Sequence, residues 1–227
     1  MFHANLKLYK NYLFNDSFVA KYPHAMPEDY CVSRTGTAEI LRRPYREGSE
    51  YTVCEIAGSS GSATVVSRRF EKAGGVVGYE MKYLLPEAGG TLTVSLAGAG
   101  KDIISVSDAL DGIRYSGGAL RSHSQNVWQT LRIEADTDTD TALIRLNGKV
   151  VSRVPFDTAA DCIDEVKIAF VCEQPAILLF TDLKAFPVPP LPEDYVPEPV
   201  MPEKKDGYVI GMNICSLWRT GSHYGWD

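Results

Sequence analysis

Acidic residues with the spacing of metal ligands stand in the middle of the chain. Asp136, Asp138 and Asp140 occupy alternate positions, as the first ligands of a calcium loop do. The rest of that pattern is missing, because Thr141 stands where such a loop needs glycine and Asn147 where it needs glutamate. We therefore favour a solvated turn and predict no cofactor, with calcium bound by the three aspartates as the alternative.

Glu134 and Asp136 form the other acidic pair that could do chemistry. Glycoside hydrolysis uses two carboxyl groups about 5 to 10 Å apart. A strand with the run E-x-D-x-x-E would supply them, but Thr139 occupies the last position of that run here. The sequence also lacks H-E-x-x-H and G-x-S-x-G, so we predict no catalytic residue.

Sugar binding needs an aromatic ring that meets the apolar face of a pyranose and planar polar groups that pair its hydroxyls. Arg114, Tyr115, His123 and Gln125 could supply both around one loop. Ordinary structural roles are the alternative for each of them. Trp128 follows closely, and we expect it to pack into the core at the head of its strand.

A second group of candidate sugar-binding residues lies at the end of the chain. Trp218, His223, Tyr224 and Trp226 follow a short apolar run and are dense enough for a glycan subsite. The alternative is an exposed chain end.

The elements that must position these residues are strands. Leu131, Ile133 and Ala135 alternate with charged residues, which is the two-residue period of a strand with one buried face. Asn147-Gly148 can adopt positive φ at both positions, so it predicts a type I′ hairpin. Both features lie in the stretch 126–154, which we interpret as neighbouring strands of one antiparallel sheet.

The remainder of the first 186 residues continues this rhythm. About ten short stretches of strand character are separated by Gly, Asp and Pro turns, and one of them, 76–85, places Val77, Tyr79, Met81 and Tyr83 on a single face. This spacing predicts an all-β protein, an antiparallel β-sandwich with helices minor.

The composition then changes. Residues 187–206 contain seven prolines and are expected to form a stiff linker. Residues 207–227 begin with an apolar run typical of a doubly buried parallel strand. Either this strand joins the sandwich or it opens a truncated second domain, and we expect the second.

Charge and apolar runs exclude some classes of function. The net charge of −6 argues against a general nucleic-acid partner. No run approaches the ~20 apolar residues of a membrane span, and no signal peptide is visible, so we expect a cytoplasmic location by default. Five cysteines without a C-x-x-C pair indicate reduced thiols rather than a disulfide framework or zinc site.

Four stretches carry a resemblance to a known family: 63–70, Trp128-x-x-Leu131-x-Ile133, 144–149 and 177–186. Over most of residues 14–186 the chain resembles the concanavalin A-like and laminin-G-like jelly-roll domains. The resemblance implies a β-sandwich of a kind that often binds carbohydrate and is commonly appended to glycan-degrading enzymes.

The segment IGMNICSLWRTGSHYGWD is similar to the opening strand and first βα loop of a glycoside hydrolase TIM barrel of the family 99-like, endo-mannanase type. This resemblance implies a catalytic domain in the same parent chain, with Trp218 to Asp227 on its functional face.

These observations lead to three hypotheses. The sandwich is a non-catalytic carbohydrate-binding or accessory domain of a glycan-degrading enzyme, and this is the one we favour. Alternatively it is purely structural and braces a neighbouring domain. In the third, it is a jelly-roll hydrolase or lyase in its own right, which requires two acidic side chains facing each other across a cleft.

Overall fold

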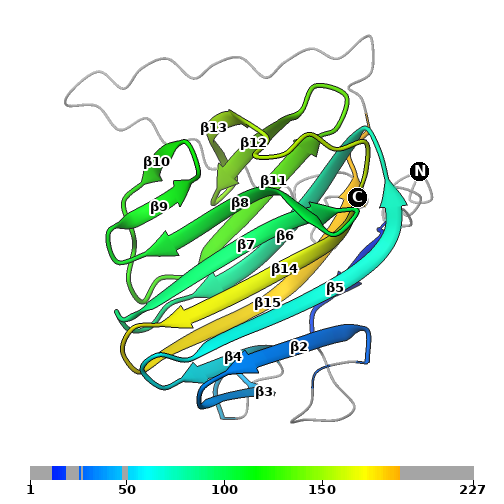
Figure 1. Ribbon diagram of the computed structural model, residues 1–227. Coiled ribbons are helices and arrows are strands. Elements are labelled where there is room, and N and C mark those ends of the chain that lie inside the picture. The colour runs from blue at the N-terminus through cyan, green and yellow to red at the C-terminus, as the bar shows by residue number, and fades with distance from the viewer. Residues whose placement is uncertain (1–11, 19–25, 27, 48–50, 190–227) are drawn as a thin grey trace, which may run out of the picture. The chain divides into compact units, whose positions relative to one another are not determined.

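The computed structural model describes residues 12–18, 26, 28–47 and 51–189, and the regular elements in these ranges are all β-strands. Two antiparallel sheets pack face to face as the two layers of a sandwich (Figure 1). The predicted antiparallel β-sandwich is therefore confirmed. No helix among the described residues is long and apolar enough to cross a membrane.

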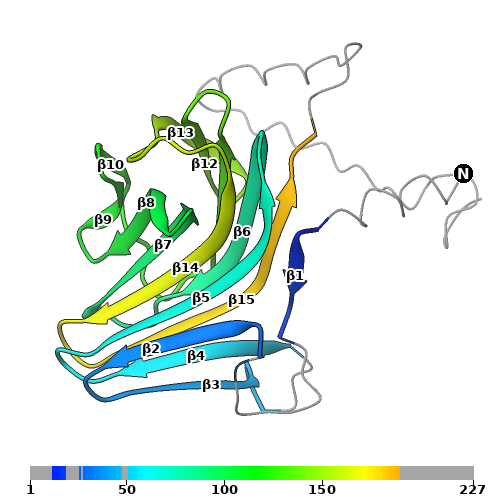
Figure 2. The same ribbon diagram turned by 45° about the vertical axis from the view of Figure 1, so that its right-hand side comes forward.

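Sheet A has eight strands. They are β1 (Phe14–Asp16), β3 (Ala38–Pro44), β4 (Thr52–Gly58), β6 (Val76–Leu84), β11 (Gln129–Asp136), β12 (Thr141–Leu146), β13 (Lys149–Pro155) and β15 (Ala176–Pro187). Seven of them follow the order β13-β12-β11-β6-β15-β4-β3, and β1 also pairs with β15. Figure 2 shows β1 running alongside β15.

Sheet B has seven strands. They are β2 (Tyr30–Thr35), β5 (Ala63–Ala73), β7 (Gly90–Gly98), β8 (Lys101–Ala109), β9 (Gly112–Tyr115), β10 (Gly118–Arg121) and β14 (Ile163–Cys172). Their order is β10-β9-β8-β7-β14-β5-β2. The chain passes between the sheets several times, so strands from both halves of the sequence meet in each layer.

Strict alternation of side chains explains why β11 takes its place in sheet A. Leu131, Ile133 and Ala135 are buried, whereas the residues between them are partly exposed. Ile133 lies opposite Tyr79 of β6 on one side and Ile144 of β12 on the other. A shift of one residue would turn the apolar set toward solvent, so burial fixes the register.

The turn between β12 and β13 follows from its two residues. Asn147 has φ of 51° and Gly148 has φ of 78°, and left-handed values at both central positions are those of a type I′ turn. The predicted hairpin is therefore confirmed. Asn147 also donates from Nδ2 to Gln129 Oε1 at 2.7 Å and accepts from the Thr130 backbone N–H at 2.8 Å.

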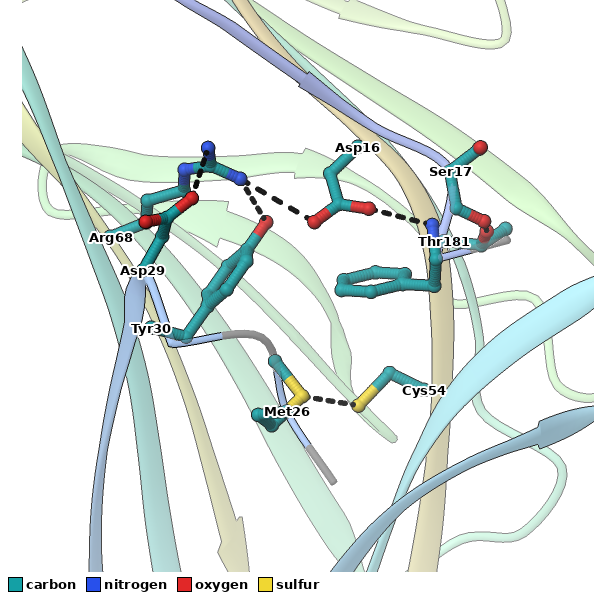
Figure 3. A network of polar contacts seen from close by, with 9 residues as sticks. Asp16, Ser17, Met26, Asp29, Tyr30, Cys54, Arg68 and Thr181 are labelled. Atoms are coloured by element: carbon teal, nitrogen blue, oxygen red, sulfur yellow. Dashed lines mark hydrogen bonds and ion pairs between the residues drawn. The ribbon is translucent and has the colours of Figure 1, made fainter. Parts of the chain in front are cut away.

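Arg68 ties the N-terminal strands to the body of the sandwich (Figure 3). Its guanidinium lies 4.5 Å from the ring centroid of Phe14 and 5.0 Å from that of Tyr30. Nη1 is 3.4 Å from Asp16 Oδ2, and Nη2 is 3.2 Å from Asp29 Oδ2. One mostly buried arginine therefore joins β1, β2 and β5 through ion pairs and cation–π contacts.

Two predicted parts of the chain lie beyond this description. The last strand, β15, ends at Pro187, and the residues from 190 onward are outside the described ranges. The proline-rich linker at 187–206 and the truncated second domain at 207–227 therefore stay predictions.

Candidate functional site

Three aromatic side chains gather on the outer face of sheet A, and we call Tyr45, Tyr51 and Trp128 the aromatic patch. Tyr45 and Tyr51 belong to the connection between β3 and β4, where the Tyr45 N–H donates to the Tyr51 carbonyl at 2.8 Å. Trp128 immediately precedes β11. The ring centroids of each pair are 5.5 to 6.5 Å apart with edge-to-face geometry.

The floor of this patch is a small apolar cluster separate from the main core. Val53, Leu84 and Leu179 are buried there, and Ile177 packs against them. Their chain neighbours, such as Cys54, Tyr83 and Phe180, are buried in the core between the two sheets. Since side chains alternate across a strand, the floor residues must face outward.

An ion pair between Lys82 and Asp182 borders the patch. Asp182 Oδ2 is 2.6 Å from Lys82 Nζ and accepts a hydrogen bond from the Tyr51 hydroxyl at 3.3 Å. This hydrogen bond to Asp182 raises the pKa of Lys82, and burial followed by the charge of Asp182 raises the pKa of Tyr51. Hydrogen bonding from Trp128 and then from Arg46 lowers the pKa of Tyr45.

A pocket of about 430 Å³ lies farther along the same face, and we call it the β11 pocket. Thr130, Arg132 and Glu134 of β11 line it together with Glu80, Arg145, Asn147 and Gly148. Positions 128, 130, 132 and 134 have the same parity along the chain, so Trp128 and the pocket residues of β11 share one face. Trp128, one member of the patch, therefore lies next to the β11 pocket.

Charged groups in the β11 pocket form a connected network. Glu134 Oε1 is 2.8 Å from Arg132 Nη2 and 3.2 Å from Arg145 Nε. Glu80 is 2.6 Å from Lys184 Nζ and 3.8 Å from Arg132 Nη1. Both carboxylates are held by cations, an arrangement that offers hydrogen-bonding groups to a ligand but no free acid and base pair.

Arg114 lies in a different pocket, on the outer side of sheet B. This pocket has a volume of about 560 Å³, and Asp111, Glu173 and Gln174 are among its lining residues. Arg114 pairs with Asp111 at 2.5 Å. Tyr115 points the other way and packs against the main core, so the two neighbours cannot serve one ligand.

His123 and Gln125 occupy the segment that connects β10 to β11. His123 Nδ1 lies 2.7 Å from Asp108 Oδ1, and only 7% of its side chain is exposed. Gln125 Nε2 donates to the Pro86 carbonyl at 3.3 Å. Arg114, Tyr115, His123 and Gln125 therefore do not converge on one platform.

The three aspartates of the predicted calcium site lie in and beside the β11–β12 turn. Asp136 accepts from the Asp138 N–H at 3.0 Å and from the Thr139 hydroxyl at 2.8 Å, and Asp140 accepts from the Ala160 N–H at 3.3 Å. No group of three or more His, Cys, Asp or Glu side chains in the described part of the chain could hold a metal ion.

The other predicted glycan-binding group lies outside the described residues. It consists of Trp218, His223, Tyr224 and Trp226, which all follow residue 189.

The aromatic patch is the feature that the sequence did not predict. Trp128 was expected between the sheets, but it packs on the outer cluster instead. Its parity with the outward-facing Thr130 and Arg132 was a usable signal. Tyr45 and Tyr51 carried no comparable signal, because only the pairing of β4 with β15, and of β15 with β6, brings them near Trp128.

No protein-family model matches the chain, and no curated protein matches its sequence. Solved structures do match. A sialidase covers 77% of the chain with a TM-score of 0.65 and 11% identity, and the chain spans only 18% of that protein. The Emp47p carbohydrate recognition domain covers 78% with a TM-score of 0.52 and 9% identity, matched over 97% of its own length.

A glycosyl hydrolase family 16 protein from Mycobacterium smegmatis covers 78% of the chain with a TM-score of 0.53 and 15% identity, matched over its full length, 100%. Identities this low demonstrate a shared fold and nothing finer. The chain therefore has the jelly-roll β-sandwich fold of the concanavalin A-like lectin and glycosyl hydrolase domains.

Proposed function

We propose that the sandwich is a non-catalytic carbohydrate-binding domain that attaches a glycan-degrading protein to its polysaccharide. The observation that carries this proposal is that the aromatic patch and the β11 pocket lie side by side on the outer face of sheet A, joined at Trp128. The rings offer an apolar surface to the C–H face of a pyranose. The arginines, carboxylates and Asn147 of the adjoining pocket offer planar groups to the hydroxyls.

A neutral or weakly charged polysaccharide fits this surface. The β11 pocket is lined by Arg132 and Arg145 against Glu80 and Glu134, and Lys184 adds one cation beside Glu80, so the net charge of the surface is small. The patch reaches across β6, β15 and β4 and adjoins the β11 pocket at Trp128, and this combined surface suits several consecutive sugar units rather than one. Proteins with similar folds include a carbohydrate recognition domain and a glycosyl hydrolase family 16 protein, which supports a role in sugar recognition.

Affinity electrophoresis in gels that contain plant, fungal or host polysaccharides tests the proposal. We expect retardation by at least one glycan, and a loss of affinity of about tenfold or more in Trp128→Ala, because a central aromatic contact is typically a binding hot spot. Arg114→Ala, in the other pocket, is the matched control and should bind normally. Loss of binding in Arg114→Ala alone would move the site to sheet B.

The purely structural sandwich is the second candidate. The rings of Tyr45, Tyr51 and Trp128, which lie over the apolar floor, form a surface that a neighbouring domain could cover. This candidate predicts no retardation by any glycan, together with protection of Trp128 from solvent quenchers only in the longer parent protein.

Catalysis by the sandwich has less support. The two carboxylates of the β11 pocket, Glu80 and Glu134, are both engaged by cations. Release of reducing sugar by the purified sandwich, abolished in Glu134→Gln, would favour a hydrolase over a binding domain.

We also propose a hydrolase barrel as the neighbour in the parent chain, on the resemblance of residues 207–227 to the opening of a family 99-like barrel. The 18% of the sialidase spanned by this chain is consistent with such a sandwich as one part of a larger enzyme. The reading frame beyond Asp227 tests this directly, and a stop codon there would remove the barrel from the proposal.

A further inference from the structure

A buried carboxylate connects the two sheets beneath the aromatic patch. Asp108 lies on β8 of sheet B, and only 3% of it is exposed. Its Oδ2 accepts a hydrogen bond from the Tyr83 hydroxyl of β6 in sheet A at 2.7 Å. Its Oδ1 lies 2.7 Å from Nδ1 of His123. Three separate parts of the chain therefore meet at one carboxyl group.

The chemistry of the three groups defines their roles. Burial, with the negative charge of Asp108, raises the pKa of Tyr83, so the phenol stays neutral and donates. An ionised carboxyl group has only acceptors, so the tautomer of His123 with its proton on Nδ1 is the one that pairs with the ionised form of Asp108. A buried charge needs such partners, because each unmade hydrogen bond leaves it desolvated.

The same groups set the path of segment 122–128, which carries the chain from sheet B to sheet A. His123 fixes its beginning through Asp108. The Asn126 N–H donates to the Leu85 carbonyl at 2.8 Å and fixes its middle. Gln129, directly after it, is held by Asn147 Nδ2 at 2.7 Å. Trp128 lies at the end of this segment.

The inner and outer contacts are adjacent on β6. Tyr83 points inward to Asp108, whereas its neighbour Leu84 points outward and forms part of the floor beneath Trp128. Loss of the bond between Tyr83 and Asp108 would displace the end of β6 or segment 122–128. Because both hold Trp128, the displacement would reach its indole ring.

We propose that Asp108 is a positioning residue, which holds Trp128 in place by bridging Tyr83 and His123. Asp108 does not touch the ligand. The effect of Asp108 on glycan affinity rests on the proposed function. Its effect on the position of the Trp128 indole does not, so affinity and indole position are measured separately.

The first measurement is the indole N–H resonance of Trp128 in the free chain, assigned by its loss in Trp128→Phe. Asp108→Leu and His123→Leu should each shift or broaden this signal. Asp108→Asn should move it less, because an amide can still accept from Tyr83 and donate to the other tautomer of His123. Asp111→Asn, at an exposed aspartate two residues from β8, is the matched control and should leave it unchanged.

His123→Leu keeps the test informative if Asp108→Leu fails to fold, because it leaves the Tyr83 bond to Asp108 intact. An unchanged Trp128 signal in folded His123→Leu would overturn the proposal. The second measurement is affinity for a retarding polysaccharide, which should fall about fivefold to tenfold in His123→Leu, because a displaced indole keeps only part of its contact with the sugar. If no glycan binds the unmodified chain while the indole signal still shifts, the proposed function fails and the positioning role stands.

Discussion

Tyr45 and Trp128 meet edge to face with ring centroids 5.5 Å apart. Tyr45 follows β3 and Trp128 precedes β11, and three strands, β4, β15 and β6, lie between β3 and β11 in sheet A. Their contact spans the outer face of β6, β15 and β4. Such pairs are worth about 0.5–1.5 kcal/mol beyond the area they bury.

We therefore expect Tyr45→Ala to lower the free energy of unfolding by about 1 kcal/mol. Tyr45→Phe keeps the ring and loses only the hydroxyl that receives a hydrogen bond from Trp128, so it should lose less. Urea denaturation of both variants measures the difference. Equal losses would show that the hydroxyl, and not the ring, holds the pair together.

Arg68 should be hard to replace. Arg68→Met removes the charge that satisfies Asp16, whose side chain is only 18% exposed, and we expect a loss of about 2 kcal/mol or more. Arg68→Lys keeps the charge but cannot stack on two rings while pairing two carboxylates, so it should recover only part of that loss.

Thermal denaturation at neutral pH distinguishes these two variants. Asp29→Asn, at the exposed end of the same network, is the control and should have little effect because exposed ion pairs contribute little. A Lys variant as stable as the native chain would contradict the importance of stacking.

Three buried tyrosines should make the fold sensitive to alkali. Burial raises the pKa values of Tyr30, Tyr79 and Tyr83 above the ordinary value of 10.0. When the folded-state pKa lies above the unfolded-state pKa, the stabilisation is fully present below the unfolded-state pKa. It is lost as the pH rises from there through the folded-state pKa. The phenols should therefore ionise only when the sheets unfold.

Phenolate absorbance and circular dichroism followed through the same pH titration check this expectation. One group of tyrosines should titrate near the ordinary value, and a later group should titrate together with the loss of sheet signal. Complete ionisation of all tyrosines with the sheets intact would contradict it.

The thiols should differ in reactivity. Cys54 is fully buried with its Sγ 3.2 Å from Met26 Sδ, and burial raises the pKa of its thiol, whereas Cys31 is exposed on β2. Because the thiolate is the reactive form, iodoacetamide at neutral pH should label Cys31 and spare Cys54. Peptide mass spectrometry after short labelling measures the ratio, and comparable labelling of both sites would mean that the core opens readily.

Local patterns were enough to predict much of the fold. Leu131, Ile133 and Ala135 fixed the face of β11, and Asn147 and Gly148 fixed the turn that follows β12, because both features depend on neighbours along the chain. Short edge strands such as β10, with four residues and a bulge, have too little periodicity to be recognised.

The candidate site was less accessible to prediction. Trp128 carries an apolar ring, and apolarity alone favoured the core. Whether a ring faces the core or the outer cluster depends on pairing between distant strands, which a single sequence does not encode locally. The bridge from Asp108 to His123 was missed for the same reason, since its partners come from two sheets and a connecting segment.

The bulge at Asp182, where φ is 52°, divides β15 into two parts. On the edge away from β6, β4 pairs with β15 up to Phe180, and β1 pairs with it from Leu183 to Ala185. If β1 were cleaved away, the backbone groups of that second part would become an open edge able to accept a strand from another molecule. A chain shortened to begin after Phe18 is thus expected to dimerise or aggregate through edge-to-edge pairing of its sheets.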